Sequence, residues 1–138
     1  MLAELSNKKS VVEEESVFRA VKNKPQLWKT ETGEFTSAVF KDSRGVSLDV
    51  GCQRNLSDII DLSREKFCSP DYAGIAEGDV KKIYEISDEL IICEDALPDN
   101  EYHAILYRKE TIELTRSQCR HVKKNLKCIN TEEILPIK

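Results

Sequence analysis

Apolar and polar residues alternate on both sides of the sequence Asp42-Ser43-Arg44-Gly45. A turn-starting aspartate followed by a glycine that accepts positive φ is typical of a three-residue loop between antiparallel strands. With that loop, one face would carry the apolar residues Ala38, Phe40, Leu48 and Val50. The opposite face would carry Ser37, Lys41, Ser47 and Asp49. The pattern predicts a β-hairpin over residues 35–50 and makes its polar face the best candidate for a site.

Three further stretches have the composition and alternation of strands: residues 17–21, 89–94 and 102–108. The acidic residues 13–15 before Ser16 also fit the start of a helix, and we favour the strand. In that strand Arg19 shares a face with apolar neighbours, which is unusual for a guanidinium without a partner. In the last strand His103, Ile105 and Tyr107 would share one face, and Ala104 and Leu106 the other.

Helical periodicity predicts helices over residues 55–67, 79–84 and 115–128. The last is the best defined, because Thr115-Arg116-Ser117-Gln118 has the pattern of a capping box. Its inward face would carry Cys119, Val122, Leu126 and Ile129. Cys119 is then a buried thiol rather than a nucleophile.

The rest of the chain is predicted to connect these elements. Residues 22–33 contain Pro25 and a Thr-Glu-Thr-Gly turn, so we expect a loop that Trp28 pins to the core. Residues 1–11 are predicted to be a flexible N-terminal segment, and residues 134–135 to add an edge strand. We therefore expect a single α+β domain over residues 12–138, with a small, largely antiparallel sheet packed against two or three helices.

The composition favours a globular protein of the cytoplasm. Of its 138 residues 40% are hydrophobic and 33% charged, and no apolar run approaches the roughly 20 residues that span a bilayer. We see no secretory signal at the N-terminus, and the five cysteines include no CxxC pair, as expected in a reducing compartment. His103 and His121 lie far apart and no close ligand pairs occur, so we expect neither a metal site nor a cofactor.

Charge is distributed unevenly along the chain. Residues 77–101 contain nine acidic residues against two lysines, whereas residues 108–138 contain eight basic residues against four acidic ones. The predicted last helix carries a basic stripe formed by Arg116, Arg120, Lys123, Lys124 and Lys127. The stripe fits a solvated helix face, a protein partner, the chain's own acidic region 77–101 or the phosphates of a nucleic acid. The pI near 5.3 and the lack of interleaved aromatic residues make nucleic acid the weaker alternative.

A second group of polar residues comes from three predicted strands. It comprises Arg19, Ser37, Lys41, Ser47, Asp49 and His103. Hydroxyls, a carboxylate and cations on one sheet face can bind an anionic ligand or transfer protons. They can equally form a solvated face, in which Asp49 and Lys41 pair across the hairpin.

Several short motifs follow one another along the chain: Phe18-Arg19-Ala20-Val21, Trp28, Gly33, Ser37-Ala38-Val39-Phe40-Lys41-Asp42, Gly45-Val46-Ser47-Leu48-Asp49 and His103-Ala104-Ile105. Their order resembles a family of small uncharacterised bacterial and phage proteins. The resemblance covers roughly residues 17–107. It implies a prokaryotic cytosolic origin and groups Arg19, Ser37, Ser47, Asp49 and His103, and it supplies no reaction.

Three functions are compatible with these observations. No residues have the spacing of a known catalytic motif, and acidic and basic residues lie in separate regions of the chain. Both observations favour a non-enzymatic binding or regulatory module that acts through a protein partner. The first alternative is an enzyme for a nucleotide or other phosphorylated substrate, using the polar face of the hairpin. The second is nucleic-acid binding through the basic 115–128 helix.

Overall fold

The architecture is that of a six-stranded antiparallel sheet with helices packed against it, in a computed structural model that describes residues 2–52 and 71–130. The sheet strands are β1 (Ser16–Lys22), β4 (Val46–Val50), β5 (Tyr72–Asp79), β6 (Leu90–Glu94), β7 (His103–Arg108) and β8 (Lys127–Asn130). The other elements are α1 (Leu2–Ser6), α4 (Val80–Tyr84), α5 (Arg116–Asn125), the 3₁₀ helix η1 (Ser37–Phe40), and the strands β2 (Trp28–Lys29) and β3 (Glu34–Phe35). The predicted α+β fold class, with a largely antiparallel sheet, is confirmed.

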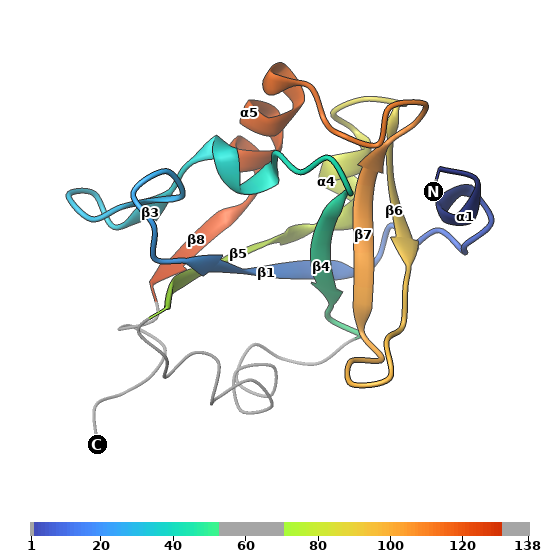
Figure 1. Cartoon of the computed structure of the whole chain (residues 1–138), viewed down its shortest axis with the longest axis horizontal. Coiled ribbons are helices and arrows are strands. Elements are labelled where there is room, and N and C mark those ends of the chain that lie inside the picture. The colour runs from blue at the N-terminus through green and yellow to red at the C-terminus, as the bar shows by residue number, and fades with distance from the viewer. Residues whose placement is uncertain (1, 53–70, 131–138) are drawn as a thin grey trace.

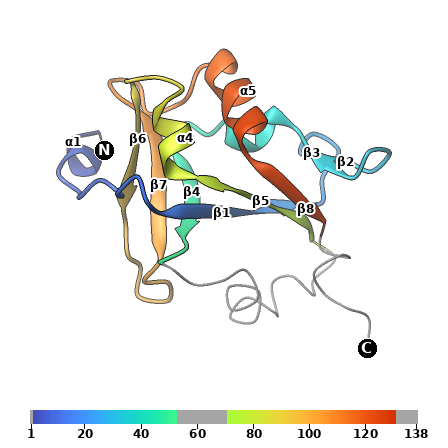
Figure 2. The same cartoon turned by 180° about the vertical axis from the view of Figure 1, so that it is seen from behind.

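The strand order is β6-β7-β4-β1-β5-β8, and every neighbouring pair is antiparallel. The sheet is strongly bent: β1, β5 and β8 run across the direction of β4, β7 and β6 (Figure 1). Helices α4 and α5 occupy the angle between these two halves, and α1 lies beyond β6 (Figures 1 and 2). The main core fills this angle, where apolar residues of β1, β4 and β7 pack with Phe40 of η1 and Val122 of α5.

The predicted hairpin over residues 35–50 is wrong, although its turn is present. The Asp42 carboxylate accepts a hydrogen bond from the Arg44 amide at 2.8 Å, and Gly45 has φ +93°. Strand β4 pairs with β1 and β7, whereas residues 37–40 form η1. A half-buried strand buries alternate residues, but here the neighbours Val39 and Phe40 are both buried and Ala38 is exposed. One helical turn buries this adjacent pair, which a strand could not do.

Most of the other predicted elements are present. Strands β1, β6 and β7 and helix α4 lie where the pattern placed them. Helix α5 begins as predicted but ends at Asn125, three residues before the predicted end, because residues 127–130 pair with β5 as strand β8. Thr115 accepts from the Gln118 amide at 3.1 Å and Gln118 accepts from the Thr115 amide at 3.0 Å, which confirms the capping box. The predicted helix over 55–67 and the predicted strand at 134–135 lie outside the described residues. Strands β5 and β8 and the short β2–β3 pair were not predicted.

The N-terminal segment, predicted to be flexible, is tied to the sheet. Leu5 of α1 packs with Cys93 and Tyr107 in a small core of its own. The Val11 amide donates to the Ile92 carbonyl at 2.8 Å, and the Glu94 amide donates to the Lys9 carbonyl at 2.7 Å. These bonds satisfy part of the open edge of β6. Among the described residues, no helix has the length and apolar character needed to cross a bilayer.

Candidate functional site

Strand pairing brings Asp49 and His103 to the same place in the sheet. Asp49 of β4 is the register partner of His103 in β7 and of Phe18 in β1. Since residues in register share a sheet face, Asp49 and His103 project on the side opposite to the core residues Leu48 and Ala104. The site thus lies on the sheet face that does not pack against α5.

A pocket of about 110 Å³ opens at this position. It is lined by Phe18, Arg19, Ala20, Ser47, Leu48, Asp49, Asn100 and His103. Four of the six residues grouped from the sequence therefore line one cavity: Arg19, Ser47, Asp49 and His103. We refer to it below as the His103 pocket.

The imidazole of His103 is oriented by an acidic residue from the loop after β6. Its Nδ1 atom lies 2.9 Å from Asp95 Oδ2 and 3.1 Å from the Asp95 carbonyl oxygen. The other carboxylate oxygen of Asp95 is 2.9 Å from the ammonium of Lys8. Two acceptors at Nδ1 favour the tautomer with a proton on Nδ1, which leaves Nε2 with a free lone pair.

Asp49 is held by an amide from the same loop region. The Asn100 side-chain nitrogen donates to Asp49 Oδ1 at 2.6 Å, and the Asn100 side-chain oxygen accepts from the Tyr102 amide at 3.1 Å. The Asn100 amide is therefore fixed at both ends, and within residues 2–52 and 71–130 no hydrogen-bond donor contacts the second carboxylate oxygen of Asp49.

Arg19 occupies the point where β1 and β4 diverge. Their pairing ends at Phe18 and Asp49, and beyond it Arg19 Nη1 donates to the Ser47 carbonyl oxygen at 2.6 Å. Burial lowers the pKa of Arg19 from its ordinary value, while the carboxylates of Asp42 and Asp49 act to raise it. Arginine remains protonated at neutral pH, so the pocket contains a fixed positive charge. Within the described part of the chain, Arg19 Nε has no hydrogen-bond acceptor.

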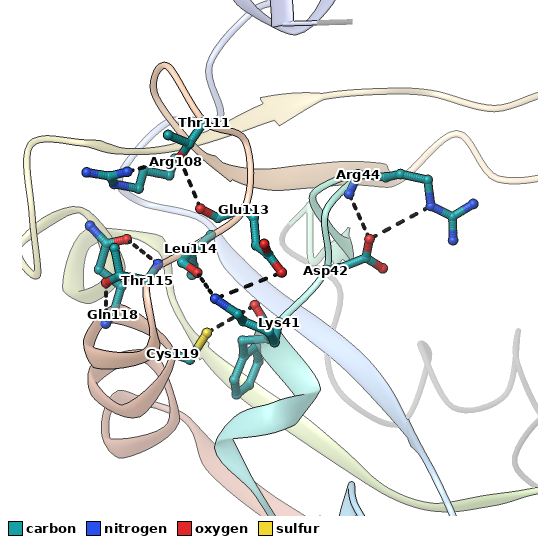
Figure 3. A network of polar contacts seen from close by, with 11 residues as sticks. Lys41, Asp42, Arg44, Arg108, Thr111, Glu113, Leu114, Thr115, Gln118 and Cys119 are labelled. Atoms are coloured by element: carbon teal, nitrogen blue, oxygen red, sulfur yellow. Dashed lines mark hydrogen bonds and ion pairs between the residues drawn. The ribbon is translucent and has the colours of Figure 1, made fainter.

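Ser37 and Lys41, the other two grouped residues, do not line the His103 pocket. Ser37 begins η1. The ammonium of Lys41 donates to the Leu114 carbonyl at 2.9 Å and lies 3.9 Å from Glu113, as Figure 3 shows. The predicted cross-strand pair of Lys41 and Asp49 is therefore absent, because residues 37–41 do not pair with β4.

The same network confirms the buried thiol of Cys119. Its Sγ atom donates to the Phe40 carbonyl at 3.3 Å (Figure 3). Burial raises the pKa of the Cys119 thiol, which works against thiolate formation. The network thus joins α5 to η1 and to the loop before α5 without forming a reactive group.

The basic stripe is only partly helical. Arg116, Arg120 and Lys124 are exposed on α5, whereas Lys127 belongs to β8. Lys123 is 3.9 Å from Glu34. Arg116 is the first residue of α5, at the helix end where the macrodipole disfavours a cation. The first turn of α5 contains no acidic residue that would offset this charge.

Two residues of the site were not singled out in the sequence. Asp95 and Asn100 belong to the loop between β6 and β7, in which Pro98-Asp99-Asn100 has the composition of a turn. Functional residues are common in polar loops that connect buried strands. The position of residues 95–101 between two predicted strands could therefore have pointed to Asp95 and Asn100. Pairing of β6 with β7 places both ends of the loop beside His103.

Comparison of the chain with protein-family models, with curated proteins and with solved structures finds no match.

Proposed function

We propose that the protein is an enzyme that uses His103 for acid–base catalysis on a small polar substrate bound in the His103 pocket. The observation that carries the proposal is the 2.9 Å contact between His103 Nδ1 and Asp95, behind a cavity that also contains Asp49 and Arg19. An imidazole that is oriented by a carboxylate and borders a cavity is a recurrent arrangement for general acid–base catalysis.

The proposed proton transfer starts at a substrate hydroxyl or a water molecule. His103 Nε2 removes this proton as the oxygen forms a bond to the electrophilic centre of the substrate, and the bond from that centre to the leaving group breaks. The carboxylate of Asp95 stabilises the imidazolium that forms. The same proton then passes to the leaving group, so that the imidazole is neutral again at the end of the cycle. Asp49 supplies a second carboxylate that orients the substrate through its free oxygen.

Arg19 provides the electrostatic part of this proposal. Its guanidinium is already fixed by the Ser47 carbonyl at 2.6 Å, so little reorganisation is needed when negative charge develops nearby. The exposed hydroxyl of Ser47 borders the same cavity and can donate a hydrogen bond to the substrate. The prokaryotic or phage cytosol expected from the sequence is the setting that we propose for this activity.

Replacing His103 with glutamine should abolish most of the turnover. A panel of chromogenic phosphate monoesters, phosphodiesters, acyl esters and glycosides is assayed with the wild-type chain and with His103→Gln. We expect at least one substrate class to be turned over, and its kcat to fall about 10²–10⁴-fold in the variant, the usual contribution of a general base.

The matched control is His121→Gln, since His121 is exposed on α5 and distant from the pocket lining. It should retain wild-type turnover. No turnover of any class, or equal losses in the two histidine variants, would contradict the proposed function.

A second candidate function is the binding of an acidic protein partner through α5. The observation in its favour is that Arg116, Arg120 and Lys124 are exposed and that no ion pair holds their side chains within the part of the chain that the structure describes. Arg116 lies in the first turn of α5, where the macrodipole disfavours a cation, and retaining it there is reasonable where the charge serves a partner.

The charge-reversed variant Arg120→Glu, Lys124→Glu should lose binding to an acidic surface. With a polyglutamate peptide as the probe, we expect about tenfold weaker binding at low salt, because a favourable charge pattern becomes repulsive. The control Lys81→Glu, Lys82→Glu reverses two exposed charges on α4 and should bind normally. Equal effects of the two variants, or stronger binding of duplex DNA than of the peptide, would contradict a protein partner.

A further inference from the structure

A larger pocket of about 330 Å³ adjoins the His103 pocket across Arg19. Arg19 and Ala20 line both cavities. The polar residues of the larger one are Arg19, Lys22, Lys24, Lys41, Asp42 and Tyr72. We call it the basic pocket, because four cationic side chains and one carboxylate line it. Its volume is at the lower end of the range of pockets that bind small organic ligands.

Two of the cations in the basic pocket are available to a ligand. Lys22 and Lys24 are exposed, and neither side chain forms an ion pair within residues 2–52 and 71–130. The ammonium of Lys41 is engaged by Leu114 and Glu113, and Asp42 offsets part of the charge of Arg19. A positive charge in excess of its local partners therefore remains at the mouth of this pocket, and it favours an anionic group.

The segment that carries these lysines is held in place. The Lys24 carbonyl accepts hydrogen bonds from the amides of Leu27 and Trp28 at 2.9 and 2.8 Å. The buried ring of Trp28 packs so closely on β5 that a Cβ added at Gly74 would lie 2.7 Å from it. The lysine backbone is thus positioned before a ligand arrives, which lowers the entropy cost of binding.

We propose that the basic pocket binds the phosphate group of a phosphate monoester whose remaining part extends past Arg19 into the His103 pocket. This inference rests on the proposed function, since it names the substrate class for the same site. A phosphate monoester carries up to two negative charges and accepts hydrogen bonds on three oxygens, which matches two lysines and a guanidinium at one end of a cavity. The shared residue Arg19 then contacts the substrate between its anionic end and its reacting end.

The binding test uses inorganic phosphate and ribose 5-phosphate as probes, with ribose as the uncharged comparison. Amide and arginine side-chain NMR signals are followed at low salt in the wild-type chain, in Lys22→Ala, Lys24→Ala, and in the control Lys81→Ala, Lys82→Ala. We expect both phosphates to shift the signals of residues 19–24, and the first double variant to bind about tenfold more weakly. The control removes the same charge from α4 and should bind like the wild type.

The failure of this inference is distinguishable from the failure of the proposed function. His103→Gln should bind inorganic phosphate with wild-type affinity, because His103 does not line the basic pocket. Absence of phosphate binding, or equal weakening in the two lysine variants, overturns the phosphate site even if His103-dependent turnover is found. Phosphate binding that depends on Lys22 and Lys24 supports the site even if no panel substrate is turned over. Ribose binding as tightly as ribose 5-phosphate would also overturn it.

Discussion

Replacing Phe40 with alanine should lower the free energy of unfolding by about 3–5 kcal/mol, the range for a fully buried aromatic residue. Phe40 is 0% exposed and meets Phe35 edge-to-face, with ring centroids 5.7 Å apart. Phe40 is also the last residue of η1, and its carbonyl accepts the hydrogen bond from the Cys119 thiol of α5. Removing the ring opens a cavity between η1 and the helix. Urea denaturation followed by far-ultraviolet circular dichroism measures the loss.

Two controls separate this effect from a general response to truncation. Phe40→Leu keeps most of the volume and should cost about 1–2 kcal/mol. Val12→Ala removes methyl groups from a side chain that is 53% exposed and should change stability by less than about 0.5 kcal/mol. If Phe40→Ala were as stable as Val12→Ala, the position of η1 in the core would be wrong.

Replacing Asp95 with asparagine should reduce the proposed turnover about 10²–10³-fold while the chain remains folded. The carboxylate 2.9 Å from His103 Nδ1 is then replaced by a neutral amide, so the imidazolium loses its stabilising charge. The Asp95 carbonyl, 3.1 Å from the same nitrogen, remains as an acceptor and keeps the ring in place. The measurement is kcat with the panel substrate that the wild type turns over, together with the ¹⁵N signals of the His103 ring.

The matched control for this prediction is Asp99→Asn in the same loop. Asp99 is exposed, and the substitution makes the same chemical change outside the pocket lining, so turnover should be unchanged. We expect the wild-type ring signals to report a proton on Nδ1. A proton on Nε2 in the wild-type chain, or unchanged turnover in Asp95→Asn, would contradict the role of Asp95 as the residue that positions His103.

The hairpin error has a local cause. The turn at residues 42–45 depends on a side-chain hydrogen bond from Asp42 and on the positive φ of Gly45, both of which the sequence predicts. A turn does not require that the chain on both sides of it forms strands. The alternation of Ala38 and Phe40 was misleading because Val39, between them, is buried as well. That second buried residue is a feature of packing against α5, which no local pattern reports.

The candidate site was partly predictable for a different reason. Ser47, Asp49 and His103 belong to strands whose alternation was assigned correctly, so these three were placed on the correct face. Arg19 alternates with the core residues Val17 and Val21, whereas the β1 partner of Asp49 is Phe18. Arg19 lines the pocket because β1 and β4 diverge beyond Phe18. The grouping of these residues into one site assumed that β4 pairs with residues 35–42, and this pairing does not occur. The actual pairings of β4 with β1 and β7 bring the same four residues together. Ser37 and Lys41 were assigned to the site only because of the predicted hairpin, and they do not line the His103 pocket.

The sequence by itself determined the features that depend on neighbouring residues. These are the alternation of β1, β4, β6 and β7, the turn before Gly45, the capping box of α5 and the buried position of Trp28. Each follows from hydrogen bonds or side-chain spacing within about ten residues. The tertiary structure alone decided the strand order, the helical turn at residues 37–40, and the contacts of the N-terminal segment with β6. These depend on contacts between distant segments, whose free energy comes from burying surfaces that only the folded chain brings together.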